Sequence, residues 1–284
     1  MLHFCNKLKG GLIILAMNIF LAVALPCEAK PLVTHFGLKK DTTVRAFAMY
    51  RNEAVYLTVT GPGKSAMAAG LAYTQAVSAG LENALFVNVG VAGHRTHDIG
   101  SAWTINKISD ADTGRNYYPM PIYGLPCAAI SLLTSSKPQF DYNHEHLCDM
   151  EASAFFETAA RFSTGELIQC LKVVSDNRLD PGRSLDPKAV EGLIRDNIGL
   201  LDLLLDKLKG RAKLVNSLEA PNFEYWIRQY RFTVSEQNRL KNLLSRFSVL
   251  TGKSLEPTDF GTVKSGKELL AALENRLSAI KYEL

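Results

Sequence analysis

The first two thirds of the sequence contain a series of short apolar segments separated by segments of helical character. The run NIFLAVAL at residues 18–25 is continuously apolar, as expected of a strand buried in a parallel sheet, and residues 85–90 predict another buried strand. We predict strands at 18–25, 44–49, 54–59, 85–90, 103–108, 129–133 and 167–174, helices at 64–78 and 149–162, and an irregular loop at 110–126. This alternation predicts an α/β fold with a mainly parallel sheet and helices on both faces.

The last part of the chain is predicted to be helical. Asp186 and Pro187 open a helix with proline in its first turn, and its apolar stripe runs to Leu208 and closes the α/β unit. Further helices are predicted at 223–229, 234–250 and 267–280, separated by breaks with glycine or proline. We therefore expect an α/β domain at 17–210 and a helical extension of unassigned role at 211–284, after a disordered or mis-started leader at 1–16.

The N-terminus permits two interpretations. Lys7 and Lys9, the apolar stretch 11–25 and the small residues up to Ala29 resemble a secretory signal peptide. Alternatively, the chain starts at Met17 and residues 18–25 form the first strand of the sheet. We favour the strand, because cleavage after Ala29 would remove the edge of the fold together with Glu28, a candidate catalytic carboxylate. A cytoplasmic protein is then expected, and an exported one if residues 1–29 are a signal peptide.

The basic charge of the chain belongs to its C-terminal part. The net charge is +4, and residues 207–284 contain 14 Lys and Arg against 8 Asp and Glu. These charges are spread along helical periods and are not clustered, which favours a solvated helical surface over a nucleic-acid site. With 47% hydrophobic and 21% charged residues, the composition is that of an ordinary globular protein, and no membrane partner is expected.

The cysteines argue against a disulfide framework and against a zinc site. There are five of them, an odd number, and they are widely spaced without any CxxC pair. We therefore expect no metal, and a reducing cytoplasm fits the pattern best.

The segment Gly61-Pro62-Gly63-Lys64-Ser65 looks like part of a phosphate-binding loop between a strand and a helix. A complete loop of that kind needs a glycine five residues before Gly63, and Thr58 stands there. A tight turn from strand to helix is therefore favoured over nucleoside triphosphate binding.

Three acidic residues are placed where strands end or helices begin. Glu28 follows the first strand, Glu151 lies in the segment DME that opens a predicted helix, and Asp176 follows the strand that ends in VVS. The carboxyl ends of parallel strands gather at one edge of a sheet, so these groups can converge there. Each also has a simpler interpretation: Glu28 as a solvated acid at a helix start, Glu151 as a partner of a helix dipole, and Asp176 as a cap that orders the loop 177–186.

Five short motifs follow one another along the chain: LPCEA at 25–29, TGPGK at 60–64, NVGVAG at 88–93, DMEA at 149–152 and VSD at 174–176. In this order they resemble the motifs of methylthioadenosine/S-adenosylhomocysteine nucleosidases and their nucleoside phosphorylase relatives. DMEA is the most specific of the five, and the resemblance covers about residues 17–208. It implies a phosphorylase-like α/β fold with a mixed, largely parallel sheet flanked by helices, to which this chain adds an α-helical C-terminal extension.

The resemblance also implies roles for individual residues. Cleavage of an N-ribosidic bond builds positive charge on the sugar and negative charge on the departing base. By similarity, Asp176 protonates or hydrogen-bonds the purine at N7, Glu151 binds the ribose hydroxyls, Met150 packs against the sugar, and Glu28 orients and deprotonates the attacking water.

Three further substrate-binding residues follow from the same resemblance. The glycines up to Gly93 bring the backbone close to the sugar or the nucleophile, Ser175 precedes the acid, and Phe140 lies near the position of the aromatic residue that stacks on the base. Met150 and the glycines have structural alternatives as well, as core filler and as a tight turn.

The departures from the family pattern bear on the reaction. Phosphorylases of this family have a glycine-proline-arginine loop after the first strand, whereas this chain has Pro26-Cys27-Glu28, which favours water over phosphate. His94 and Arg95 could still supply a cation for phosphate.

We therefore predict a nucleosidase that hydrolyses a purine nucleoside, of adenine type by analogy, without metal or organic cofactor and as a homodimer. The alternatives are a phosphate-dependent nucleoside phosphorylase and a noncatalytic nucleoside-binding module.

Overall fold

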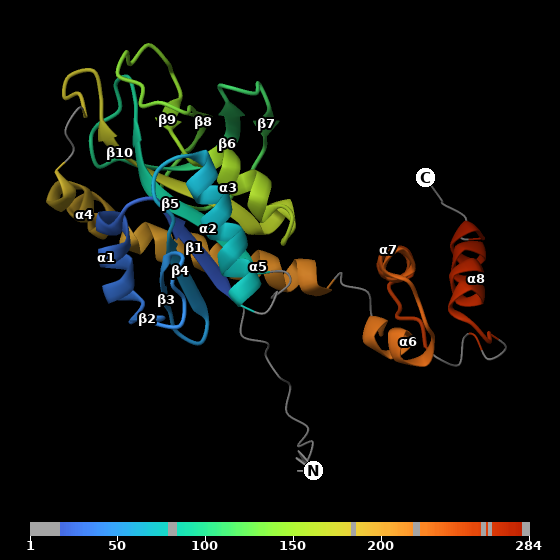
Figure 1. The fold of residues 1–284 in the computed structure, drawn as a ribbon. Helices are drawn as coiled ribbons and strands as arrows, with labels where there is room; N and C mark the ends of the chain where they lie inside the picture. The colour runs from blue at the N-terminus through green and yellow to red at the C-terminus, as the bar shows by residue number, and fades with distance from the viewer. Residues whose placement is uncertain are drawn as a thin grey trace. The chain divides into compact units, whose positions relative to one another are not determined.

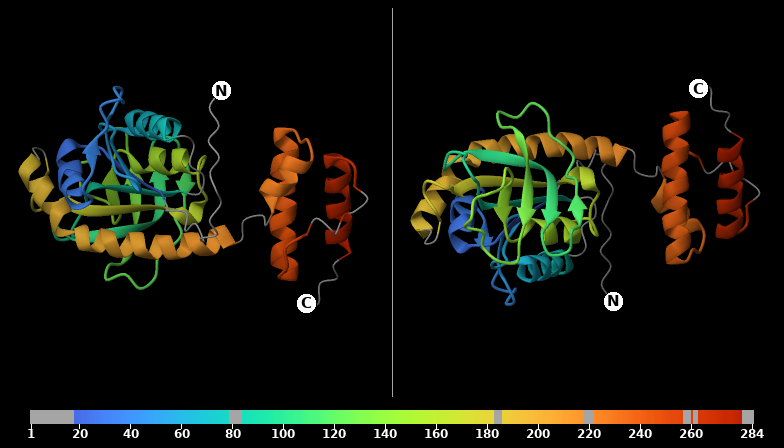
Figure 2. Two further views of the ribbon diagram at one scale, coloured as in Figure 1. Left: turned by 90° about the horizontal axis from the view of Figure 1, so that it is seen from below. Right: turned by 90° about the horizontal axis from the view of Figure 1, so that it is seen from above.

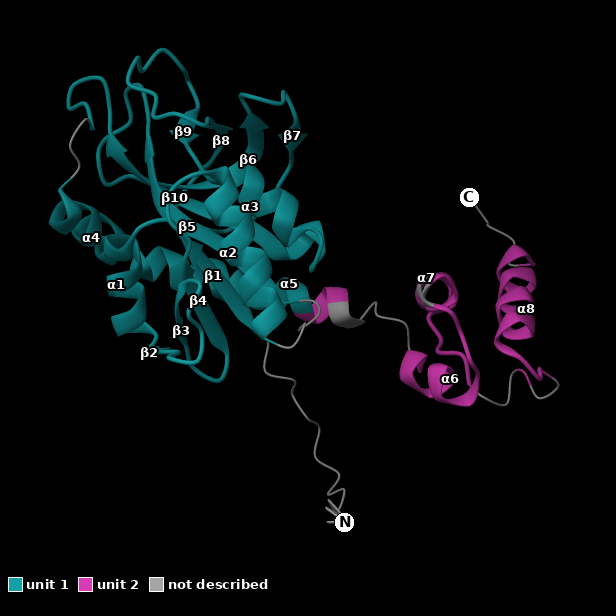
Figure 3. Cartoon of the chain, viewed as in Figure 1, with its two compact units in different colours: residues 1–212 teal, residues 213–284 magenta. Residues whose placement is uncertain are grey.

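The computed structural model describes residues 18–78, 84–182, 186–217, 222–256, 260 and 263–279. It divides into two compact units, Met1–Ala212 and Lys213–Leu284 (Figure 3). The predicted leader at 1–16, and with it most of the segment that resembles a signal peptide, lies outside the described residues. Among the helices that are described, none combines the length and the apolarity that crossing a membrane requires.

The first unit is built on one mixed sheet, which has ten strands among the described residues (Figure 1). The strands are β1 Ile19–Val23, β2 Lys39–Lys40, β3 Ala48–Arg51, β4 Val55–Val59, β5 Leu85–Gly93, β6 Ala102–Asp110, β7 Asn116–Tyr117, β8 Ala129–Thr134, β9 Leu147–Asp149 and β10 Ile168–Asp176. The helices are α1 Pro26–His35, α2 Lys64–Val77, α3 Ala152–Ala159, α4 Pro187–Asp196 and α5 Ile198–Ser217, with a short 3-10 turn, η1, at Gly165–Leu167. This is the predicted α/β architecture.

Part of the sheet closes into a ring. β5 pairs with β10, β10 with β6, β6 with β8 and β8 with β9, and β9 returns to β5 where Cys148 lies opposite Gly93. On the other side of β5 the sheet continues through β1, β4, β3 and β2. The pairings of β1 with β4 and β5, of β5 with β10 and of β6 with β8 are parallel, as predicted, whereas β10–β6 and the β2–β3–β4 edge are antiparallel.

Helices cover both faces of this sheet. Figure 2 shows α5, in orange, along one face and α2, in cyan, on the opposite face. Successive residues of a strand point to opposite faces, so both faces of the central strands must be apolar. Phe20 and Phe86 accordingly pack with Phe155 in the core under α2 and α3, while Leu171 and Val173 point to the side of α1, α4 and α5.

The predicted first strand is present, but not at the edge. β1 is fully buried and lies between β4 and β5, parallel to both. The expectation that residues 18–25 form the edge of the fold is therefore wrong: the edge is β2, whose residues Lys39 and Lys40 are exposed. Helix α1 follows directly at Pro26, which takes the first helical position where its missing N–H costs nothing.

Other boundaries differ from the prediction for local reasons. The strand predicted at 44–49 lies at β3, and the helix predicted from residue 149 begins at Ala152, because Asp149 ends strand β9 and its carboxylate accepts the Ala152 N–H. The single helix predicted after Asp186 is two helices, α4 and α5. They break at Asn197, whose side-chain amide donates to the carbonyls of Leu193 and Gly100.

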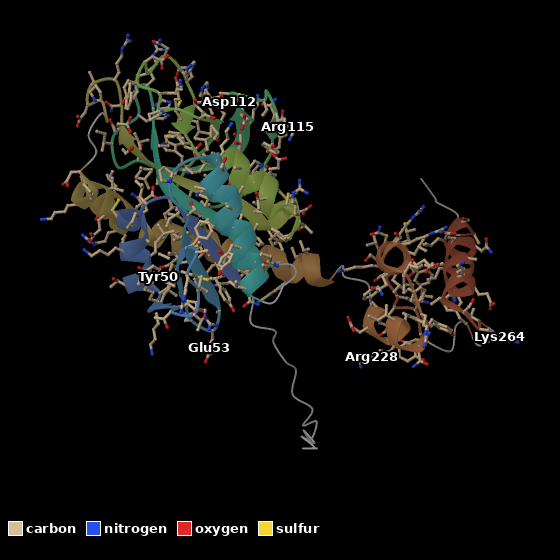
Figure 4. All side chains as sticks on the ribbon, viewed as in Figure 1. Tyr50, Glu53, Asp112, Arg115, Arg228 and Lys264 are labelled. Carbon is tan, nitrogen blue, oxygen red and sulfur yellow. The ribbon has the colours of Figure 1, made fainter. Side chains whose placement is uncertain are left out.

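Besides the last residues of α5, the second unit contains α6 Phe223–Gln229, α7 Val234–Thr251 and α8 Gly266–Ser278, close to the three predicted helices. Helix α7 begins with a capping box between Thr233 and Glu236 and is capped after Thr251 by Gly252, which has the positive φ that favours glycine. The core of this unit is apolar and aromatic: Trp226, Leu240, Leu244, Phe247, Leu255, Leu269, Leu270, Leu273 and Leu277. Basic residues such as Arg228 and Lys264 are exposed on its surface (Figure 4).

Candidate active site

A cavity of about 350 Å³ lies where β1, β5, β9 and β10 end. Its walls come from the turns that follow these strands, from the turn before α2 and from the loop after β8. The seven residues predicted to be catalytic or substrate-binding all line this one cavity: Glu28, Gly93, Phe140, Met150, Glu151, Ser175 and Asp176. The fold therefore brings together groups that are up to 148 positions apart between Glu28 and Asp176.

Glu28 lies in the first turn of α1 with its carboxylate turned back into the protein. Oε2 accepts the N–H groups of Ala24 and Leu25 at 2.9 and 2.8 Å, and Oε1 accepts that of Val91 at 3.0 Å. The residue is 2% exposed, so its interpretation as a solvated acid is wrong. Burial raises the pKa of Glu28, against these N–H groups and the ammonium of Lys172, which act to lower it.

Glu151 lies at the N-cap position of α3, but its carboxylate binds the N-terminus of another helix, α2. Oε1 accepts the N–H of Gly63, the N-cap residue of α2, at 2.6 Å, and Oε2 accepts that of Met150 at 3.3 Å. Burial, reinforced by the charge of Asp149, raises the pKa of Glu151 to about 7, and Lys172 opposes this rise. A substantial fraction of this carboxyl is therefore protonated at neutral pH.

Lys172 and Asp149 form a buried ion pair that interacts electrostatically with the carboxyls of Glu28 and Glu151. Lys172 Nζ lies 2.9 Å from Asp149 Oδ2, and both side chains are almost completely buried. Burial acts to lower the pKa of Lys172, but the carboxylates of Asp149 and Glu151 outweigh it and hold the pKa above its ordinary value. Lys172 therefore offsets part of the negative charge of the carboxyls that line the cavity.

Asp176 ends β10 with both carboxyl oxygens hydrogen-bonded. The Ser175 hydroxyl donates to Oδ1 at 2.5 Å and the Tyr142 hydroxyl donates to Oδ2 at 2.6 Å. A Cβ at Gly93 would lie 2.8 Å from Oδ2, and one at Gly182 would lie 2.7 Å from the Asp176 side chain. Both glycines are thus needed for the close approach of backbone to this carboxyl.

Asp176 is not the residue that orders the loop after β10. Asn177 does so, because its side-chain oxygen accepts the N–H groups of Leu179 and Asp180 and its amide donates to the carbonyl of His97. The carboxyl of Asp176 points instead into the cavity.

Phe140 and Met150 also line the cavity. Phe140 is 42% exposed and lines the cavity, so its ring is accessible to a molecule bound there. Met150 is half-buried and lines the cavity, which makes the interpretation as core filler incomplete.

The glycine-rich turn before α2 is the tight turn that the sequence favoured. Gly61 and Gly63 have positive φ, and the Lys64 ammonium is paired with Asp110 at 3.0 Å and with Asp112 at 2.5 Å. A lysine held between two carboxylates is not the phosphate ligand of a nucleotide-binding loop. The turn serves the cavity through the N–H of Gly63, which binds Glu151.

His94 and Arg95, the possible phosphate ligands, do not line this cavity. They lie beside a separate void of about 10 Å³ with Tyr142, His144 and other residues. His94 is 2% exposed, and burial followed by the nearby His97 lowers its pKa, so it is neutral at physiological pH. Arg95 pairs with Glu145.

Sequence reasoning missed Lys172 and Tyr142. A lysine inside the otherwise apolar strand LKVV was the available signal for the first, because a buried lysine requires a carboxylate partner. For Tyr142 the sequence offers no such signal, since it lies in an irregular loop. Within the described part of the chain, no three His, Cys, Asp or Glu side chains are grouped so that they could hold a metal ion.

The ring of strands between β5 and β9, the central β1 and the flanking helices make up the phosphorylase-like α/β fold. No protein-family model and no curated protein matches the chain. The structure of the methylthioadenosine/S-adenosylhomocysteine nucleosidase of S. pneumoniae with a transition-state inhibitor matches with a TM-score of 0.53 at 16% identity, over 68% of this chain and 99% of that one.

Two further solved structures have comparable TM-scores. The nucleosidase of Colwellia psychrerythraea, solved with adenine, matches with a TM-score of 0.53 at 14% identity, over 68% of this chain and 96% of its own. A variant of the nucleosidase (MTAN) of Chlamydia trachomatis matches with a TM-score of 0.51 at 19% identity, over 65% of this chain and 97% of its own. At these identities the similarity establishes the fold.

Proposed function

We propose that this chain is a nucleosidase that hydrolyses the N-ribosidic bond of a purine nucleoside, with adenine-type bases as the preferred leaving group. The observation that carries the proposal is the meeting of Glu28, Glu151 and Asp176 around one cavity. Supporting it, three solved structures with this fold are named as nucleosidases of adenine nucleosides, one with adenine bound and one with a transition-state inhibitor.

The acids can divide the reaction between them. As the N-ribosidic bond breaks, its electron pair moves to the base, and a proton from Asp176 passes to N7 so that the base departs neutral. Water adds to the anomeric carbon and gives its proton to Glu28. Oε1 of Glu28 accepts one N–H and keeps a lone pair for that water, and a raised pKa suits a general base. Solvent restores both protonation states.

Substrate positioning is assigned to the remaining residues. In this proposal Glu151 accepts hydrogen bonds from the ribose hydroxyls, Met150 packs against the sugar, and Phe140 covers the base. Ser175 orients the carboxyl of Asp176 through its hydrogen bond, and Gly93 leaves room for that carboxyl.

The charge of the cavity favours water over phosphate as the nucleophile. Among the described residues that line it there are four carboxyls, those of Glu28, Asp149, Glu151 and Asp176, and neither Lys nor Arg. Carboxylates stabilise the positive charge that develops on the sugar ring but repel a phosphate dianion.

The finer expectations from the sequence remain part of this proposal. The α/β domain at 17–210 carries the activity without metal or organic cofactor, and the helical extension at 211–284 is a separate element. We propose a cytoplasmic homodimer. The absence of disulfides among the four described cysteines fits a reducing compartment.

The test is base release from adenosine, inosine, methylthioadenosine and S-adenosylhomocysteine, each with and without phosphate. We expect release without phosphate, with Asp176→Asn lowering kcat by about 100-fold or more and Glu28→Gln abolishing hydrolysis more than binding. Release that requires phosphate would make the chain a phosphorylase. Binding without any turnover would make it a nucleoside-binding module.

A further inference from the structure

Tyr142 is an unusual residue in the loop between β8 and β9. Of residues 136–146, all of which are described, it is the one buried residue, at 7% exposure. Its φ is +47°, in the left-handed region that a bulky side chain rarely adopts. Such a backbone conformation costs free energy, so contacts of the Tyr142 side chain have to offset that cost.

The Tyr142 hydroxyl connects three segments. It accepts the N–H of Gly182, in the loop between β10 and α4, at 3.0 Å and donates to Asp176 Oδ2 at 2.6 Å. A tyrosine hydroxyl has one hydrogen to donate, and because Gly182 is itself a donor, that hydrogen is directed to Asp176. The loop after β8, the end of β10 and the loop after β10 therefore meet at a single carboxyl.

This geometry serves the step that Asp176 has to perform. When a carboxyl gives its proton to a leaving base, negative charge develops on its oxygens. A hydroxyl fixed 2.6 Å from Oδ2 stabilises that charge without having to move during the reaction. Phe140, two residues before Tyr142, lines the cavity, so the same loop carries a residue that faces the base.

We propose that Tyr142 is a positioning residue for acid catalysis: it fixes the carboxyl of Asp176 toward the departing base and holds the loop of Phe140 in place. The inference rests on the proposed function and adds to it a residue that the motif resemblance does not include. Because the Tyr142 hydroxyl assists protonation of the leaving base, it should speed the cleavage of substrates whose base needs a proton. It should not affect substrates whose leaving group departs unaided.

The experiment compares two leaving groups in the full-length chain. Tyr142→Phe keeps the ring and removes the hydroxyl. We expect kcat for the purine nucleoside that the wild type cleaves best to fall by about tenfold or more, with KM little changed, since a hydrogen bond to a developing charge is lost. Hydrolysis of para-nitrophenyl riboside, whose leaving group requires no protonation, should keep its wild-type rate and thereby show that the variant is folded.

Two further variants sharpen the comparison. Ser175→Ala removes the other hydroxyl that donates to Asp176 and should show the same dependence on the leaving group. Tyr117→Phe is the matched control, because it removes a tyrosine–carboxylate hydrogen bond of 2.7 Å, to Glu157, that lies outside the cavity. It should leave both rates unchanged.

The outcomes are distinct. A wild-type kcat for the purine nucleoside in Tyr142→Phe, or equal losses on both substrates, overturns the positioning role while leaving the nucleosidase assignment in place. If the wild-type chain cleaves neither the nucleosides nor para-nitrophenyl riboside, the proposed function fails and this inference fails with it.

Discussion

Replacing Glu151 by glutamine should make the α/β unit more stable at alkaline pH while it weakens substrate binding. Glu151 shares a buried region with Asp149 and Glu28, and Lys172 is the cation that faces them. Glu151→Gln removes one negative charge and keeps the shape of the side chain. The amide oxygen can still accept the N–H of Gly63, but the amide nitrogen then faces the N–H of Met150.

The size of the effect follows from the pKa of Glu151, which is raised from 4.5 to about 7. Because the pKa is higher in the folded than in the unfolded state, the associated stability is fully present below about pH 4.5 and is lost as the pH rises through about 7. One pKa unit corresponds to about 1.4 kcal/mol, so the wild type loses ~2 to 3 kcal/mol between about pH 5 and about pH 8. The lost hydrogen bond to Met150 costs the variant ~1 kcal/mol at every pH.

We therefore expect Glu151→Gln to be slightly less stable than the wild type near pH 5 and ~1 to 2 kcal/mol more stable near pH 8. Urea unfolding followed by tryptophan fluorescence measures this. The chain has two tryptophans, and a common Trp226→Phe background leaves Trp103, in the first unit, as the reporter. The same difference between variant and parent at both pH values would refute the reasoning.

Three other predictions concern the same cavity. Gly93→Ala places a Cβ 2.8 Å from Asp176 Oδ2 and should lower kcat by about tenfold or more, measured by base release. Lys172→Met leaves a buried carboxylate unpaired and should cost ~3 to 5 kcal/mol in urea unfolding, whereas Arg115→Met, which breaks an exposed pair, should cost less than ~1 kcal/mol. Glu28 must be ionised to act as the general base, and burial raises its pKa. As the pH is lowered, kcat should therefore begin to fall at a higher pH than it would with an ordinary carboxyl. A kcat that stays constant at acidic pH would contradict this role.

The convergence of Glu28 and Asp176 could be predicted because it follows from topology. Strands β1, β5 and β10 are parallel, so the residues just after them lie at one edge of the sheet wherever they occur in the sequence. Continuous apolar runs identified these strands, and Glu28 and Asp176 were therefore placed correctly near one another. Glu151 follows β9, which no such run identified, and its place was expected from the start of a predicted helix. The interior position of β1 could not be predicted in this way, since a run that is buried on both faces has the same composition wherever in the sheet it lies.

Contacts between side chains from separate loops could not be predicted from motifs or periodicity. The pairing of Lys172 with Asp149 depends on β9, a strand of three residues whose pattern is too short to recognise. The hydrogen bond from Tyr142 to Asp176 depends on how an irregular loop folds back over the sheet. In both cases one partner was visible in a motif and the other was not.

The position of Glu151 depends on residues that never touch the cavity. Its partner Gly63 is followed by Lys64, which pairs with Asp110 at the end of β6, and Asp110 accepts the hydroxyl of Ser153 on α3.

Further hydrogen bonds connect Ser153 to Asp149, which lines the cavity. The Ser153 N–H donates to the Thr134 hydroxyl, and that hydroxyl donates to Asp149, the partner of Lys172. These contacts connect the turn before α2 to the ends of β6, β8 and β9. They therefore fix both Gly63, which binds the carboxyl of Glu151, and the start of α3, where Glu151 lies. A substitution at Asp110 should therefore weaken ribose binding as well as stability, although this residue does not line the cavity.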